Sequence, residues 1–180
     1  MFVQTEVTPN PNSLKFLPGK NVSNSGSFEV TKKEDTNSDL VRNLLSINGV
    51  TGVFLGQDFL SVNKKEEVIW EDIKHIVISL INDFYATGKE FVIASELFEE
   101  KKEELNEIEK KIISLLETKI RPAVAKDGGD IKFKEFKDGV VKVELQGSCS
   151  GCPSSTMTLK QGVQNLLCHY LPEVKEVVAV

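Results

Sequence analysis

Short runs of alternating apolar and polar residues dominate the first part of the chain, and this period is the one expected of β-strands. Segments rich in Pro, Asn, Ser and Gly separate the runs and are typical of turns and loops. The predicted strands cover residues 2–7, 14–17, 28–30, 53–55 and 59–62. The pattern therefore predicts a sheet-forming region at the start of the chain.

Apolar residues recur at helical spacing in two segments of the same region. Asn37 or Ser38 is suited to cap a helix that carries Leu40, Val41, Leu44 and Leu45 on its buried face. The stronger pattern covers residues 69–86. Its predicted buried stripe comprises Ile69, Ile73, Ile76, Val77, Leu80, Ile81 and Phe84. Residues 1–87 are therefore expected to form a small α+β domain.

The composition changes after residue 88. Residues 96–111 are dominated by Glu and Lys, and a charge run of mixed sign is typical of a solvated helix or linker. We place a charged linker at 88–104 and a second domain at 105–180. The expected fold class is α+β, with two small α/β domains joined by this linker.

The second domain is predicted to run helix, strand, strand, helix, strand. Its first helix is expected to bend at Arg121-Pro122, because proline removes a backbone N–H. Residues 127–130 read Asp-Gly-Gly-Asp and predict a tight turn with solvated or capping carboxylates. The remaining elements are strands near 131–136, 140–145 and 174–180 and a helix over 153–171.

The loop between the second of these strands and the long helix holds Cys149 and Cys152. Pro153 suits the first position of a helix, where a missing N–H costs nothing. Both cysteines therefore precede a helix N-terminus, whose dipole lowers the pKa of nearby thiols and favours thiolates. Thiolates in this setting are suited to binding a metal ion or an iron–sulfur cluster.

Two thiolates are half of the usual ligand set, because structural zinc sites and iron–sulfur clusters take four protein ligands. Cys168 lies about 24 Å further along the same helix and away from its predicted apolar stripe, so it does not reach the same ion. His75 belongs to the first domain, and His169 adjoins Cys168. Two copies of the chain that brought their cysteine loops together would supply four thiolates.

The predicted apolar stripe of that helix contains Leu159, Val163, Leu166 and Tyr170. A partly exposed thiol without a ligand role is therefore the expectation for Cys168.

Composition limits the class of protein. A net charge of −5 argues against nucleic-acid binding, and three cysteines do not make a secreted disulfide framework. No apolar run is long enough to span a membrane, and no signal segment is recognisable. A strand pattern follows Met1 at once, so we expect a bacterial cytoplasmic protein. A mature mitochondrial matrix protein is the alternative.

Residues 121–175, with the block GSCSGCPSST, resemble the C-terminal domain of NifU as found in Nfu-type iron–sulfur proteins. The opening MFVQTEVTPNPNSLKFLPG resembles the N-terminal domain of the same proteins. The resemblance implies a 4Fe-4S cluster bound between the two protomers of a homodimer and delivered to apo-proteins. It also implies contact with upstream cluster-assembly proteins. Cys149 and Cys152 are the implied ligands, and no catalytic residue is expected.

Two other functions use the same cysteine spacing. A thiol–disulfide oxidoreductase would use Cys149 and Cys152 as a redox pair. In such enzymes the helix that follows usually begins at the first cysteine, whereas here Pro153 predicts a start after both. A structural zinc ion shared between two subunits would need the same four thiolates. The ligand count alone does not separate zinc from an iron–sulfur cluster.

Overall fold

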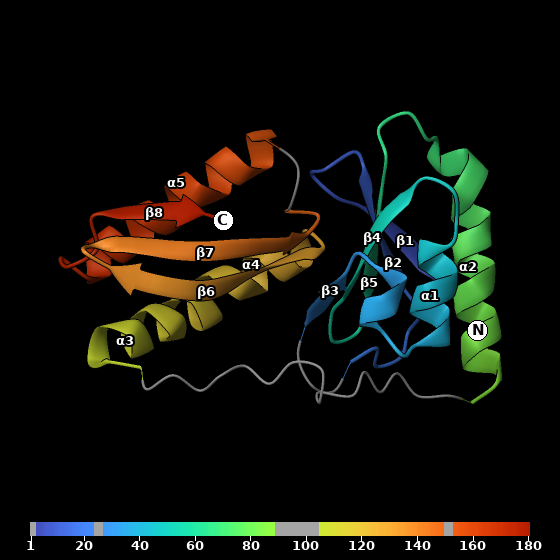
Figure 1. Cartoon of the computed structure of the whole chain (residues 1–180), viewed down its shortest axis with the longest axis horizontal. Coiled ribbons are helices and arrows are strands. Elements are labelled where there is room, and N and C mark those ends of the chain that lie inside the picture. Colours follow the sequence, from blue (N-terminus) through green and yellow to red (C-terminus); the bar gives the residue numbers. More distant parts are fainter. Residues whose placement is uncertain (1–2, 24–26, 89–104, 150–152) are drawn as a thin grey trace. The chain divides into compact units, whose positions relative to one another are not determined.

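The computed structural model describes residues 3–23, 27–88, 105–149 and 153–180 (Figure 1). The chain divides into two compact units, residues 1–99 and 100–180. Apart from Gly88, the predicted charged linker lies outside the described residues, so its bounds stay a prediction. Helices and strands occur in both units, which confirms the expected α+β class.

A five-stranded sheet forms the first unit, and each strand runs antiparallel to its neighbours. The order across the sheet is β1 (Gln4–Val7), β2 (Ser13–Leu17), β5 (Leu60–Lys64), β4 (Val50–Leu55) and β3 (Phe28–Val30). All the predicted strands of this region are therefore present. β4 is longer than the predicted strand at 53–55, because pairing continues through Gly52 to Val50, with a register shift between these two residues.

Two helices lie on one side of this sheet, α1 (Asp39–Leu45) and α2 (Trp70–Ala86) (Figure 1). A short 3-10 helix, η1 (Lys33–Asp35), precedes them. The Ser38 hydroxyl accepts a hydrogen bond from the N–H of Val41 at 3.4 Å, so Ser38 is the cap of α1.

The buried face of α2 is narrower than the predicted stripe. Its buried residues follow a strict four-residue spacing and are Ile73, Val77, Ile81 and Tyr85. Ile69 is 59% exposed and Ile76 is 38% exposed, so the prediction was wrong for both. Ile69 precedes the helix, and Ile76 lies one position before the buried row and turns towards solvent.

The second unit has the predicted element order. Its first helix is continuous through α3 (Glu107–Leu115), a π-helical turn η3 (Leu116–Ile120) and α4 (Arg121–Lys126). Asn106 and Glu109 form a reciprocal capping box at the start of α3, with both hydrogen bonds at 2.9 Å. The π-helical turn stands directly before the predicted bend at Pro122.

The sheet of this unit has the order β6 (Gly129–Lys137), β7 (Val140–Gly147), β8 (Glu176–Ala179). β6 and β7 are antiparallel, whereas β8 runs parallel to β7 after the crossover helix α5 (Pro153–Tyr170). The β6–β7 ladder begins with the pair Gly129–Gly147, so pairing extends to within two residues of Cys149.

Residues from α3, α4, α5 and the sheet share one core in this unit. Val163 and Leu167 of α5 are fully buried, and Cys168 is partly buried against the core. Tyr170 is 50% exposed, so the predicted stripe was wrong at that position. The four-residue row that includes Val163 and Leu167 faces the sheet, and this orientation brings Cys168 closer to the core than predicted.

Candidate functional site

The cysteine loop follows the end of β7 directly. Cys149 lies two residues beyond that strand and is 8% exposed, so it is buried. α5 begins at Pro153, as predicted. Cys152 is one of the residues 150–152, which lie outside the described residues. The order of strand, loop and helix around the cysteines is therefore confirmed, and Cys149 is the ligand candidate whose surroundings are defined.

Hydrogen bonds hold the backbone around Cys149 from two sides. The Ser148 hydroxyl donates to the carbonyl of Asp127, and the N–H of Ser148 donates to the carbonyl of Gly128 at 3.2 Å. On the other side, the Thr156 hydroxyl in the first turns of α5 donates to the carbonyl of Cys149 at 3.2 Å. The loop is thus tied both to the turn before β6 and to the helix that follows it.

The Asp-Gly-Gly-Asp turn supplies one wall of this site. Gly128 has φ +81° and Gly147 has φ +66°, and both angles lie in the left-handed region that favours glycine. The sulfur of Cys149 packs against Gly129, where an added Cβ atom would come within 2.6 Å of Sγ. A turn 20 residues upstream therefore borders the candidate ligand directly.

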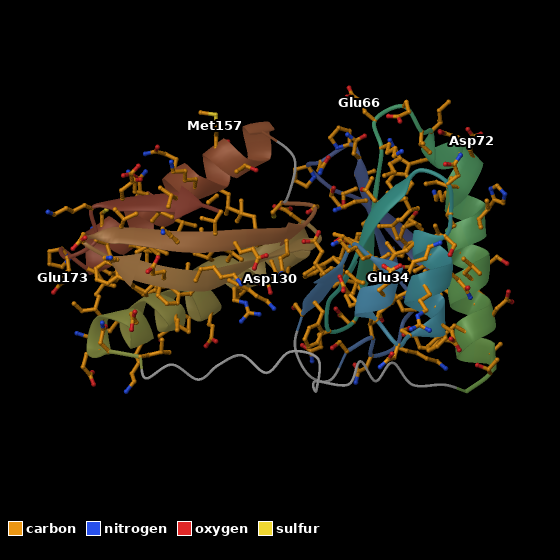
Figure 2. The ribbon with its side chains drawn as sticks, in the orientation of Figure 1. Glu34, Glu66, Asp72, Asp130, Met157 and Glu173 are labelled. Carbon is orange, nitrogen blue, oxygen red and sulfur yellow. The ribbon has the colours of Figure 1, made fainter. Side chains whose placement is uncertain are left out.

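Asp130 corrects the expectation for the carboxylates of this turn. Asp127 is exposed as predicted, but the side chain of Asp130, which is labelled in Figure 2, is 5% exposed and forms an ion pair with Arg121. Nε and Nη2 of the guanidinium each donate to one carboxylate oxygen at 2.9 Å, and the N–H of Ile131 donates to Oδ1 at 2.8 Å. The carboxylate is therefore a structural acceptor.

The π-helical turn η3 determines where Arg121 lies. Pro122 has no N–H for the usual helical bond, and the N–H of Arg121 donates five residues back, to the carbonyl of Leu116. The extra residue in this turn shifts the angular position of Arg121 around the helix axis. Sequence reasoning expected a break or bend at Arg121-Pro122, whereas the helix continues through the proline after a π-helical turn. It missed the ion pair with Asp130, because the local helical partner of Arg121 is Glu117, at 3.7 Å.

The remaining thiol and the two histidines lie elsewhere. The Cys168 thiol donates to the carbonyl of Val174 at 3.2 Å, which is a structural contact near the end of α5. His75 is exposed on α2 in the first unit, as expected for a surface histidine. His169 is exposed, and its ring contacts Tyr170 edge to face with centroids 5.1 Å apart.

Within residues 3–23, 27–88, 105–149 and 153–180, no group of three or more His, Cys, Asp and Glu side chains is arranged to hold a metal ion. Within the same ranges, no helix combines the length and apolar character needed to cross a membrane.

Comparison with known proteins identifies both parts of the chain. The family model described as "Scaffold protein Nfu/NifU N terminal" matches residues 3–88, and the model described as "NifU-like domain" matches residues 112–178. The second match includes the candidate site and the elements that form it.

Two curated relatives match nearly the whole chain. NFU1 iron-sulfur cluster scaffold homolog, mitochondrial, from Homo sapiens is 47% identical and aligns with 98% of this chain and 71% of its own length. NifU-like protein 4, mitochondrial, from Arabidopsis thaliana is 43% identical and aligns with 98% of this chain. The chain spans 65% of the length of that plant protein.

Among solved structures, a NifU-like protein from Saccharomyces cerevisiae is 28% identical. The alignment covers 51% of this chain and 84% of the yeast chain, with a TM-score of 0.45.

The names of the curated relatives bear on the expected location. Both proteins are described as mitochondrial, whereas the sequence alone favoured a bacterial cytoplasm. The relatives therefore favour the mitochondrial alternative over the cytoplasmic prediction.

The two family models match the chain in the domain order expected from the resemblance. The alignment with the human relative covers both domains, because it includes 98% of the chain. Identity of 47% over 98% of the chain is far above the level at which a shared family is in question. The chain therefore belongs to the Nfu family, with an Nfu/NifU scaffold-type N-terminal domain followed by a NifU-like domain.

Proposed function

We propose that this protein is an iron–sulfur cluster scaffold and carrier that binds its cargo through Cys149 and Cys152. The position of Cys149 carries the proposal, because it lies between β7 and the N-terminus of α5 within the segment that matches the NifU-like domain. The names of the relatives support an iron–sulfur scaffold role.

The surroundings of Cys149 suit an anionic ligand set. α5 is 18 residues long and begins four residues after Cys149, so its N-terminal dipole favours thiolates and an anionic cluster nearby. The hydrogen bonds of Ser148 and Thr156 fix the backbone on either side of the sulfur. A ligand on a fixed backbone needs less reordering when it binds iron.

We propose a 4Fe-4S cluster shared by two copies of the chain. A cubane cluster takes four cysteine thiolates, and each copy contributes Cys149 and Cys152. Cys168 is not one of the cluster ligands in this proposal, because its thiol lies near the far end of α5 and donates a hydrogen bond to the carbonyl of Val174. The homodimer forms around the cargo.

Delivery then follows by ligand exchange, in which cysteines of an apo-protein replace Cys149 and Cys152 on the iron atoms one after another. The two residues between the cysteines in the sequence, Ser150 and Gly151, are small and add little bulk that would hinder an incoming thiolate. Upstream assembly proteins supply the cluster, and apo-proteins receive it. No side chain acts as a general acid or base in this scheme, so we propose a carrier and not an enzyme.

Anaerobic reconstitution with iron and sulfide tests this function. We expect about four irons and four sulfides per two chains, as required for one cubane. Cys149→Ser and Cys152→Ser should abolish uptake, and Cys168→Ser is the matched control that should retain it. Uptake that survives either loop substitution but fails in Cys168→Ser would contradict the ligand assignment.

The same preparation separates the two alternative functions. One zinc ion per two chains without sulfide would indicate a structural metal site, and a metal-free reversible disulfide would indicate a redox pair. The start of α5 at Pro153, after both cysteines, already argues against the redox pair, because such pairs usually have the first cysteine at the helix N-terminus.

A further inference from the structure

Gly128 and Gly129 are adjacent, but their backbones make different demands. Gly128 has φ +81°, a value that side-chain-bearing residues rarely adopt. Gly129 has no such angle and is the first residue of β6, paired with Gly147. No left-handed angle therefore calls for glycine at position 129, and its surroundings supply the reason for glycine there.

The side-chain position of Gly129 is already occupied. A Cβ atom there would lie 2.6 Å from Sγ of Cys149, 2.8 Å from the carbonyl oxygen of Gln146 and 3.1 Å from the backbone nitrogen of Cys149. Nonbonded carbon atoms in contact are about 3.5–4.0 Å apart, so a methyl group does not fit beside the sulfur. Cys149 rests in a notch that exists because residue 129 has no side chain.

The neighbours of this notch differ in how easily they move. The Gln146 carbonyl belongs to the β6–β7 ladder, whose pairing runs without interruption from Gly129–Gly147 to Phe133–Val143. The Cys149 backbone is tied by Ser148 and Thr156. The sulfur, in contrast, moves by rotation about a single side-chain bond. An added methyl group at position 129 therefore displaces the sulfur, and it also forces a small shift of the Gln146 carbonyl, which would lie 2.8 Å away.

We propose that Gly129 is a positioning residue for the cluster ligand Cys149. Because it has no side chain, it leaves the notch to Sγ, keeps the sulfur shielded from solvent and fixes the direction from which the sulfur meets iron. A side chain at position 129 exposes the thiol in the cluster-free chain and loosens the cluster in the loaded dimer. The second part rests on the proposed function, whereas the first concerns the cluster-free chain alone.

The reactivity of Cys149 towards iodoacetamide tests the first part. Gly129→Ala is compared with Gly162→Ala on α5, where an added Cβ meets nothing within 4 Å. Both are made in the full chain with Cys152→Ser, so that the loop carries a single thiol. After labelling, cleavage at Lys142, Lys160 and Lys175 separates Cys149 (peptide 143–160) from Cys168 (peptide 161–175), and Cys168 serves as an internal reference for unfolding.

Gly129→Ala should raise the labelling rate of Cys149 about tenfold, because thiol reactivity follows exposure, and leave Cys168 unchanged. Gly162→Ala should change neither rate. An unchanged Cys149 rate in Gly129→Ala would overturn the proposal. Equal acceleration of both thiols would overturn it as well, because the glycine would then serve the fold of the whole domain.

Cluster release to a chelator, followed by absorbance in chains that retain Cys152, tests the second part. Loaded Gly129→Ala should release its cluster several-fold faster than loaded Gly162→Ala, and equal rates would overturn this part. If the unaltered chain takes up no cluster at all, the proposed function fails, while the labelling rates still decide the role of Gly129.

Discussion

Removal of one partner from the ion pair between Arg121 and Asp130 should destabilise the second unit measurably. The Asp130 carboxylate is 5% exposed and accepts both guanidinium bonds at 2.9 Å, whereas the Arg121 side chain is 34% exposed. Arg121→Met keeps most of the apolar stem and leaves the buried Asp130 carboxylate without its charged partner. It also removes the exposed ion pair of Arg121 with Glu117 at 3.7 Å. Loss of one partner from a buried pair costs about 3–5 kcal/mol, and the partial exposure of Arg121 places the expected cost near 3 kcal/mol.

The exposed pair between Lys134 and Glu144 is the matched control. Its nitrogen–oxygen distance of 2.7 Å is shorter than that of the Arg121 pair, but its side chains are 49% and 35% exposed. Exposed pairs contribute about 0–1 kcal/mol, so Lys134→Met should cost less than 1 kcal/mol. The comparison therefore separates burial from distance as the source of stability.

Urea unfolding should be followed by two signals, because the chain has two compact units. Trp70 is the one tryptophan of the sequence and lies in the first unit, so its fluorescence reports on that unit. Circular dichroism reports on both units. Arg121→Met should shift a circular dichroism transition to lower urea and leave the Trp70 transition in place.

Asp130→Asn and the double variant with Arg121→Met complete a double-mutant cycle. The double variant should lose less free energy of unfolding than the sum of the losses in the two single variants. Equal costs for Arg121→Met and Lys134→Met, both below 1 kcal/mol, would refute the reasoning from burial. Simple additivity in the cycle would refute direct coupling of the two residues.

Three further predictions concern the first unit. Trp70→Phe removes the N–H that donates to the carbonyl of Pro11 at 3.0 Å and should cost about 1 kcal/mol, measured by circular dichroism in urea. Gly56→Ala places a Cβ 2.4 Å from the Phe59 ring and should cost about 1–3 kcal/mol in the same assay. Burial raises the pKa of Tyr85 to about 12, so the folded chain keeps this proton between pH 10 and 12 while the unfolded chain loses it. Stability should therefore fall over that interval relative to Tyr85→Phe, and parallel pH profiles would contradict this.

Hydrophobic periodicity predicted most of the fold, because each element buries one face against a sheet. It predicted the α2 positions Ile73, Val77 and Ile81 correctly. It failed at Ile69 and Ile76, because a stripe read from sequence includes neighbours of the buried row, and only packing determines how wide the covered face is.

The candidate site was predictable to the level of its loop and not to the level of its walls. Proline and glycine chemistry placed Cys149 ahead of a helix start. The contact of Gly129 with the sulfur joins residues 20 positions apart, and the bond from Arg121 to Asp130 depends on a π-helical turn. Neither interaction has a local sequence signal, since both arise only when β6 pairs with β7 and α4 packs on β6.

Native mass spectrometry of anaerobically loaded protein, desalted to remove small thiols, tests the shared cluster most directly. If the cysteine loops of two chains together ligate the cluster, the spectrum should contain one loaded species, which consists of two chains and a single Fe4S4 unit. When Cys149 is replaced by serine in every chain, no loaded species should appear. A monomer that holds the complete Fe4S4 mass unaided would contradict the account, because one chain would then have supplied ligands beyond Cys149 and Cys152.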